Sequence, residues 1–229
     1  GQWQINAIVR DTSYDVTRHT ELYAELVDQV VAFTQSTGSP HTAAISSSLV
    51  EDNRFAIPLS WYSGWADADL GGNVLEQGIT YCLENINMVE FLAEEFEAEN
   101  GRAPTIAVIS LPGEYGQDGA AGAKYAVEEL GLELVYDGEG LVGAEGNTEV
   151  IQALVEAQPD IVQTTTTPAI SAEIFGATTQ QGLAEALWIG TGPSFNLALF
   201  ETPLGPEFQR RWTQSAYYAP YGSDVERMD

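Results

Sequence analysis

The sequence predicts an α/β fold with parallel sheets, and the second half of the chain carries the clearest evidence. Apolar, strand-like segments there are centred near residues 108, 134, 162 and 188, which are 26, 28 and 26 residues apart. A strand, a helix and two turns need about this length, so the spacing indicates repeated strand–helix units and a doubly wound parallel sheet. The predicted strands are 105–111, 132–136, 160–163 and 186–190.

Helical patterns fill the gaps between these strands. In each gap apolar residues recur three and four positions apart, which is the spacing of one helix face. The residues concerned are Ala123, Ala126, Val127 and Leu130, then Val150, Ile151, Leu154 and Val155, and then Ile170, Ile174 and Phe175.

The first half of the chain gives a less regular pattern. Short apolar segments at 5–11, 43–46 and 55–61 are predicted to be strands. Two amphipathic helices are also expected, and the second has a Glu-rich outer side. Their apolar faces are Leu22, Leu26, Val27 and Val30, and then Ile86, Val89, Leu92, Ala93 and Phe96.

The charge balance excludes some function classes. Asp and Glu total 34 against 8 Lys and Arg, which gives a formal net charge of −26. Nucleic-acid binding needs basic surface to displace counterions, and anionic lipid would repel such a chain, so neither partner is expected. The acidic surface fits a secreted protein or one from a salty habitat, and its simplest explanation is a solvated coat without any binding role. No apolar run reaches the length of a membrane span.

The sequence offers little for catalysis or cofactor binding. Its two histidines, His19 and His41, form no zinc-binding pair, and Cys82 is the single cysteine. Nucleophile-elbow and Walker motifs are absent, and the glycines at 112–125 and 190–195 do not have dinucleotide-fingerprint spacing. We therefore expect no cofactor, no metal and no enzymatic activity. A hydrolase that uses a strand-end serine such as Ser46, or a sensory or assembly module, remains the alternative.

Hydroxyl-bearing and aromatic residues follow most of the predicted strands. The segment IPLSWYSGWAD, residues 57–67, begins as an apolar strand and continues into serine, tryptophan and tyrosine. Ligands of parallel α/β sheets bind beyond the carboxyl ends of the strands, and this composition suits a small polar molecule. These residues also have purely structural explanations, because serines cap helices and aromatic rings fill hydrophobic cores. The other polar strand ends are Ser46–Ser48, 110–119, Thr164–Thr167 and 190–196.

The order of these segments resembles the type I periplasmic binding proteins, and within them the leucine/isoleucine/valine-receptor group, which are solute receptors of ABC importers. The first similar stretch is VVAFTQSTGSPHTAAISSSLVEDNRFAIPLS, residues 30–60. The second is TIAVISLPGEYGQDGAAGAKYAVEELGLELVYDG, residues 105–138. The third is IQALVEAQPDIVQTTTTPAISAEIFGATTQQGL, residues 151–183. Together they extend the resemblance over nearly the whole chain.

The resemblance implies two Rossmann-like lobes with parallel sheets, joined by hinge strands, that close on a solute. Lobe I would be 1–82 and lobe II 83–217, with 218–229 returning toward lobe I. Family members begin with a strand and helix before this sequence and continue after it, so the chain is expected to be part of a longer protein. The expected partners are a small-molecule solute and the membrane subunits of an importer. The expected location is extracytoplasmic, in the periplasm or at the cell surface, with a lipid anchor left open.

The resemblance also assigns ligand-binding positions. The first-lobe serines and backbone groups would hold a carboxylate, and a second-lobe tyrosine would complete the cage in the interlobe cleft. In the family's amino-acid binders a second-lobe acid pairs with the ammonium of the solute, but the matching place here is Thr191–Gly192, which carries no carboxylate and so speaks against an α-amino acid. The resemblance as a whole implies a small polar solute, such as an amino acid, an amide or a similar molecule. The ligand-binding residues predicted in this way are Ser46, Ser47, Ser48, Ser60, Trp61, Tyr62, Ser63, Gly64, Trp65, Tyr115, Thr165, Thr166, Thr167, Thr191 and Gly192.

Overall fold

The computed structural model describes residues 4–141 and 144–215, and its fold is α/β with parallel sheets. The chain forms two compact units, Gly1–Gln77 and Gly78–Asp229, referred to below as unit 1 and unit 2. The division lies five residues before the lobe boundary predicted after residue 82. The predicted return of 218–229 falls outside the described residues.

Unit 1 is built on a pair of parallel strands, β1 and β2. Its helices α1 and α2 pack on each other. Together with β2 they supply most of a small core, whose buried residues include Tyr23, Ile45, Leu49 and Ala56. The elements are α1 (Val16–Leu26), β1 (Phe33–Thr37), α2 (Ser39–Glu51), β2 (Ala56–Leu59), the 3-10 turn η1 (Ser63–Ala66) and α3 (Ala68–Gly71).

Unit 2 contains a five-stranded parallel sheet in the order β4-β3-β5-β6-β7. The four strands predicted from the regular spacing are all present within two or three residues of the expected bounds. The sequence did not predict the edge strand β7, which is only three residues long. The strands are β3 (Thr105–Ser110), β4 (Glu133–Glu139), β5 (Ile161–Thr165), β6 (Leu187–Gly190) and β7 (Trp212–Gln214).

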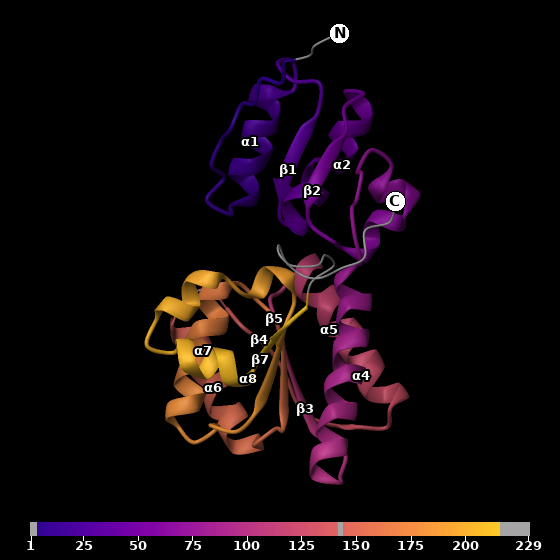
Figure 1. Cartoon of the computed structure of the whole chain (residues 1–229). Coiled ribbons are helices and arrows are strands. Elements are labelled where there is room, and N and C mark those ends of the chain that lie inside the picture. The colour runs from indigo at the N-terminus through magenta and orange to yellow at the C-terminus, as the bar shows by residue number, and fades with distance from the viewer. Residues whose placement is uncertain (1–3, 142–143, 216–229) are drawn as a thin grey trace. The chain divides into compact units, whose positions relative to one another are not determined.

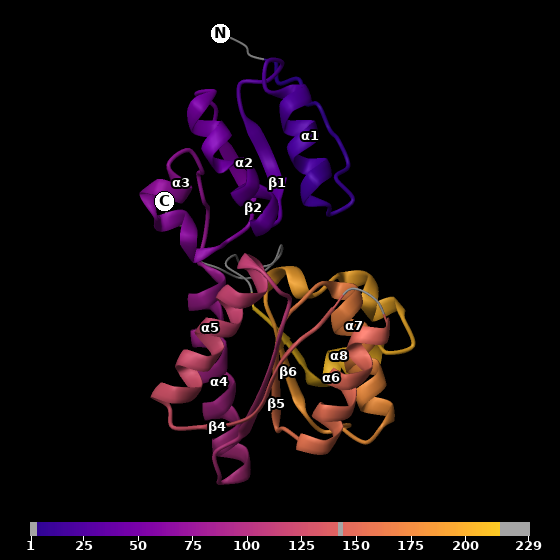
Figure 2. The same cartoon turned by 180° about the vertical axis from the view of Figure 1, so that it is seen from behind.

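Helices cover both faces of this sheet, as expected for a doubly wound fold. Figures 1 and 2 show α4 and α5 together on one face and α6, α7 and α8 on the other. The helices are α4 (Tyr81–Asn100), α5 (Glu114–Glu129), α6 (Ala144–Ala157), α7 (Pro168–Gln180) and α8 (Gly205–Arg211), with 3-10 turns η2 (Gly192–Ser194) and η3 (Leu197–Glu201).

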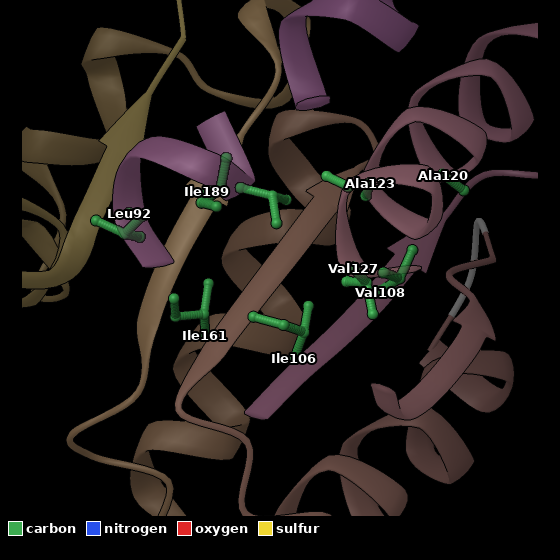
Figure 3. Packing of buried hydrophobic residues seen from close by; sticks show 10 residues of the cluster. Leu92, Ile106, Val108, Ala120, Ala123, Val127, Ile161 and Ile189 are labelled. Atoms are coloured by element: carbon green, nitrogen blue, oxygen red, sulfur yellow. The ribbon is translucent and has the colours of Figure 1, made fainter. Parts of the chain in front are cut away.

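A hydrophobic core of unit 2 lies between the sheet and the helices α4 and α5 (Figure 3). β-Branched residues of three neighbouring strands, Ile106, Ile161 and Ile189, are fully buried there. Burying each such side chain contributes roughly 1.5–3 kcal/mol. Gly122 lets α5 approach α4 closely, because a Cβ at that position would lie 2.1 Å from the carbonyl oxygen of Cys82.

Two strand predictions in unit 1 are wrong. Residues 5–11 form no strand, and Ile5 and Val9 are 92% and 82% exposed. No described residues pair with this segment, and alternating apolar residues make a strand only beside another strand. Residues 43–46 lie inside α2, where Ile45 and Leu49 bury one helix face. A short apolar segment fits either a buried strand or a helix, and its length alone does not distinguish them.

The true first strand of unit 1, β1, was not predicted from the sequence. Its sequence is FTQST, and of these five residues only Ser36 is buried. The segment therefore lacks both an apolar run and an alternation of apolar and polar residues, which are the two strand signals available in a sequence.

Candidate ligand-binding site

The carboxyl ends of the unit 2 strands gather a set of buried hydroxyl groups. The Tyr115 hydroxyl oxygen, from the first turn of α5, lies 2.7 Å from Thr191 Oγ1 and 3.1 Å from Ser194 Oγ. It also lies 3.1 Å from the carbonyl oxygen of Thr166. We call Tyr115, Thr166, Thr191 and Ser194 the strand-end network. It joins the ends of β5 and β6 to the start of α5.

The hydroxyl groups of Tyr115, Thr191 and Ser194 bond to one another, and Thr166 joins them through its backbone. Tyr115 is 5% exposed, and Thr166, Thr191 and Ser194 are 0% exposed. Thr166 Oγ1 lies 2.8 Å from Ser171 Oγ, and Ser194 Oγ donates to the carbonyl oxygen of Thr164 at 3.1 Å. The network therefore holds the strand ends in place. Of the ligand-binding residues predicted in unit 2, only Thr167 and Gly192 are partly exposed.

Thr165 belongs to a second buried group on the other face of β5. Gln163 Nε2 donates to Thr165 Oγ1 at 2.8 Å and to Asn85 Oδ1 at 2.7 Å. Gly119 of α5 passes directly over Thr165, since a Cβ there would lie 2.2 Å from Thr165 Oγ1. Close packing of α5 on β5 and α4 thus explains Gly119 and Gly122, while Gly116 lies against the backbone of Leu111.

A buried acid, Glu84, lies beside the predicted residue Gly192. Glu84 is in the first turn of α4 and is 6% exposed. The Gly192 N–H donates to Glu84 Oε1 at 3.1 Å, and the Ser215 hydroxyl donates to the same oxygen. Burial raises the pKa of Glu84, and these two hydrogen bonds oppose the rise. Sequence reasoning assigned the glutamates of this helix to its solvated side and so missed Glu84.

The strand ends of unit 1 carry a smaller polar cluster. Ser60, directly after β2, has its Oγ 2.7 Å from Ser39 Oγ at the start of α2. Trp65 Nε1 donates to Ser60 Oγ at 3.1 Å. Ser39 follows Gly38, whose φ of 98° turns the chain from β1 into α2. The dipeptide Gly38–Ser39 was the sequence signal for this strand end, and it was missed because β1 was missed.

The aromatic residues after β2 have different environments. Trp65 is 6% exposed and belongs to the unit 1 core, whereas Trp61 and Tyr62 are partly exposed. Trp61 Nε1 donates to the carbonyl oxygen of Gln77. Tyr62 packs edge-on against Trp65 with ring centroids 5.4 Å apart, and its ring lies over Gly64. Ser63 and Gly64 form the start of η1 and are also partly exposed.

The serines Ser46, Ser47 and Ser48 lie in the interior of α2, which corrects their predicted place at a strand end. Ser46 is buried, and its hydroxyl donates to the carbonyl oxygen of Ala43 within the helix at 2.9 Å. Ser47 is exposed. Residues in the middle of a helix have their backbone N–H groups engaged, so these serines do not offer the helix-start geometry on which their prediction depended.

The two histidines come together in unit 1. Their rings are 5.6 Å apart, and His19 Nε2 lies 3.2 Å from Ser36 Oγ. Burial, with the nearby His41, lowers the pKa of His19 to about 4. Burial also lowers the pKa of His41. Among the described residues no group of three or more His, Cys, Asp or Glu side chains is arranged to hold a metal ion.

An open groove of about 440 Å³ lies on unit 2. It is lined by residues of β3, α5 and β4, among them Ser110, Gln117, Lys124 and Glu139. Lys124 Nζ lies 2.9 Å from Asp137 Oδ2 at this groove. None of the predicted ligand-binding residues lines it.

Comparison with known proteins identifies the fold and the family. A family model described as "Periplasmic binding protein" matches residues 1–227. The chain belongs to the periplasmic binding protein family. This agrees with the type I architecture predicted from the sequence. A search of curated proteins found no match to the chain.

Several solved structures resemble this periplasmic binding protein. A fatty acid ABC transporter substrate-binding protein from Thermomonospora curvata is 26% identical, with a TM-score of 0.85 over 96% of this chain and 55% of the other. A branched-chain amino acid ABC transporter protein from Thermus thermophilus with bound valine is 21% identical, with a TM-score of 0.71 over 82% and 48%. A solute-binding protein from Rhodopseudomonas palustris HaA2 in complex with p-hydroxybenzoic acid is 14% identical, with a TM-score of 0.69 over 84% and 52%.

This chain therefore spans about half the length of the solved structures that it matches. The ligands of these three proteins are a fatty acid, valine and p-hydroxybenzoic acid, which are chemically diverse. The shared fold consequently does not select one class of solute. No described helix combines the length and the apolar character that crossing a membrane requires.

Proposed function

We propose that the protein is an extracytoplasmic solute receptor of an ABC importer that binds a small polar molecule at the strand ends described above. The observation that carries the proposal is the family match over residues 1–227. The three solved proteins compared above each have a small organic molecule as their ligand. The proposed partners are accordingly a small solute and the importer's membrane subunits.

The candidate solute-contacting residues are those at strand ends that stay partly exposed. In unit 2 these are Thr167 and Gly192, and in unit 1 Trp61, Tyr62 and Ser63. The strand-end network lies next to Thr167 and Gly192 in the chain, and its satisfied hydrogen bonds hold the backbone of these two segments of unit 2 in one conformation. A solute that carries polar groups at one end and an apolar body suits such a mixture of backbone amides and rings.

The arrangement of serines favours a receptor over an enzyme. A serine nucleophile needs a base within hydrogen-bond reach. The Ser46 hydroxyl, which the enzymatic alternative requires, donates to a carbonyl oxygen of its own helix. Ser36 does contact His19, but Ser36 is 5% exposed and its Oγ also lies 2.8 Å from Thr42 Oγ1.

The experiment is a thermal-unfolding screen of the full chain against amino acids, amides, carboxylic acids, aromatic acids and sugars. A solute present at 100 times its dissociation constant should stabilise the folded protein by about 2.7 kcal/mol. Each compound that shifts the melting temperature is then titrated by calorimetry. A screen in which no compound shifts the melting temperature argues against the receptor. Turnover of an ester or amide library that disappears in Ser46→Ala would favour an enzyme instead.

A further inference from the structure

The open groove on unit 2 has no part in the proposed receptor function. It has a volume of about 440 Å³ and is lined by residues of β3, α5 and β4. Sites that bind small molecules usually have volumes of ~300–1,000 Å³, so the groove is large enough for a ligand. All of its lining residues belong to unit 2, and none of them is a proposed solute contact.

A serine of β3 lines the groove where the strand pattern would place an apolar core residue. Ile106, Val108 and Ser110 alternate along β3, so their side chains point to the same face of the sheet. Ile106 and Val108 pack in the core against α4 and α5 (Figure 3). Ser110 is 5% exposed and lines the groove instead. Ala120 and Ala121 of α5 also line it, and their short side chains leave its space open.

The Ser110 hydroxyl is nearly buried and has no hydrogen-bond partner. Among the described residues, none forms a hydrogen bond with it. Its oxygen is not one of the fully enclosed polar atoms that lack a partner, so it is reached from the groove. A hydroxyl in such a place is unfavourable unless water or a ligand bonds to it. The groove therefore contains one built-in polar group that is aimed at an occupant.

Two carboxylates of β4 lie beside this hydroxyl. In the register of the sheet, Val108 pairs with Asp137 and Ser110 pairs with Glu139. Asp137 reaches α5, where Lys124 Nζ lies 2.9 Å from its Oδ2, and Glu139 is two positions further on the same face of the strand. Among the described residues, none forms an ion pair or a side-chain hydrogen bond with Glu139.

The lining groups indicate the chemical class of the ligand. The polar ones are the Ser110 hydroxyl, the Gln117 amide, the Lys124 ammonium and the carboxylates of Asp137 and Glu139. The described residues that line the groove include no aromatic or large aliphatic side chain, which disfavours an apolar ligand.

Neither sign of charge suits the whole groove. An anion would meet two carboxylates and only one ammonium, on a protein whose formal net charge is −26. A cation would meet the Lys124 ammonium in the same groove. Hydroxyl groups both donate and accept, so they can bond to carboxylates, to an ammonium and to an amide alike.

We propose that this groove is a second ligand site, which binds an uncharged polyhydroxylated molecule of the size of a monosaccharide or a cyclic polyol. In this site Glu139 accepts hydrogen bonds from ligand hydroxyl groups, while Ser110 and Gln117 both donate and accept. Because the groove is open, part of the ligand stays in water, and we expect dissociation constants in the millimolar range. The proposal is independent of the receptor function, since the two involve different residues.

Two variants test the site. Ala121→Leu fills the groove from an exposed position of α5, where leucine is a good helix former. Ala98→Leu is its matched control, because Ala98 is an exposed alanine of α4 that does not line the groove. Ser110→Ala removes only the hydroxyl that lacks a partner.

The experiment is a titration of the full chain with each probe, followed by ligand-observed saturation-transfer NMR. The uncharged probes are D-glucose and myo-inositol, and cyclohexanol has the ring of myo-inositol with a single hydroxyl group. D-Glucuronate and D-glucosamine add a negative and a positive charge to the glucose ring. The wild type and Ala98→Leu should bind glucose or inositol more tightly than cyclohexanol. Ala121→Leu should weaken this binding tenfold or more, and Ser110→Ala roughly threefold to tenfold, as expected for one hydrogen bond.

Several results would overturn the proposal. They are no binding of either uncharged polyol to the wild type, equal binding of cyclohexanol, or a charged sugar that binds tenfold more tightly than glucose. Glucose or inositol binding that is unchanged in both Ala121→Leu and Ser110→Ala would place the polyol elsewhere and would also overturn it. Ser110→Ala alone decides if Ala121→Leu does not fold. A solute found in the thermal screen should keep its affinity in Ala121→Leu, so the receptor function stands or fails separately.

Discussion

The two units of this chain differ in how their sheets are built. In unit 2 the strands β3 and β6 are mostly apolar, and β5 is buried along its whole length although its second half is Gln163, Thr164 and Thr165. In unit 1, β1 has one buried residue out of five, and the core is supplied largely by helices. A sheet covered on both faces requires continuous apolar strands, whereas a short two-stranded sheet does not. The hydrophobic pattern of a sequence is therefore informative for unit 2 and much less so for unit 1.

The largest expected effect tests the core of unit 2. Ile161→Ala removes a fully buried side chain from the central strand β5 and should lower the free energy of unfolding by about 2–5 kcal/mol. The measurement is urea denaturation followed by circular dichroism. Leu197→Ala is the control, because Leu197 is 74% exposed and its loss should change stability by less than about 0.5 kcal/mol. Similar effects for the two variants would contradict the described core.

The next effect tests whether the strand-end network is structural. Tyr115→Phe removes a hydroxyl that has three oxygen neighbours within 3.1 Å, and it leaves Thr191 and Ser194 with one partner fewer. The free energy of unfolding should fall by roughly 0.5–1.5 kcal/mol, as for the loss of other buried hydrogen bonds. Tyr125→Phe on the same helix, where the ring is 53% exposed, should have no measurable effect. An unchanged melting temperature for Tyr115→Phe would mean that the network is not formed.

The third prediction is a pH dependence of stability that arises from a histidine of unit 1. His19 has a pKa of about 4 in the folded protein, against about 6.5 in an unfolded chain. As the pH falls below 6.5, the unfolded chain binds protons that folded His19 rejects, so stability should decrease until about pH 4 and then level off. A pKa difference of one unit corresponds to ~1.4 kcal/mol of unfolding free energy. His19 is partly exposed, so solvent screening will make the loss per unit smaller than this. Denaturation at several pH values will show this slope.

The variant His19→Gln serves as the comparison for that slope. It removes the titrating ring and keeps a side chain that can bond to Ser36, so the decrease between pH 6.5 and pH 4 should become shallower. A slope that is identical in both proteins would assign the pH dependence to other groups.

The smallest effect concerns the serines that the sequence misplaced. Ser47 is exposed in the interior of α2, where alanine is the better helix former. Ser47→Ala should therefore leave the protein unchanged or stabilise it by up to about 0.5 kcal/mol. It should also leave the affinity for any solute unaltered, because Ser47 is not at a strand end. A loss of solute affinity in Ser47→Ala would restore the ligand role that the sequence suggested for it.

Particular residues show how far the sequence could be read. The strands of unit 2 were predictable from residues such as Ile106 and Ile189, because their burial follows directly from an unbroken apolar run. The sequence predicted only that Thr191 and Tyr115 would lie at the same edge of the sheet. That their hydroxyl groups bond to each other, and are buried, depends on the angle at which α5 meets β6. No local pattern in the sequence encodes that angle.

By itself the sequence determined the α/β class, the regular strand–helix repeat of unit 2 and the likeness to periplasmic binding proteins, because these depend on hydrophobic periodicity and on motif order along the chain. Only the tertiary structure decided that Ser46–Ser48 belong to a helix, that Trp65 is core, and that Glu84 lies against Gly192, 108 positions further along the chain. Contacts between distant segments depend on how helices pack on a sheet, and that packing is a property of the whole fold.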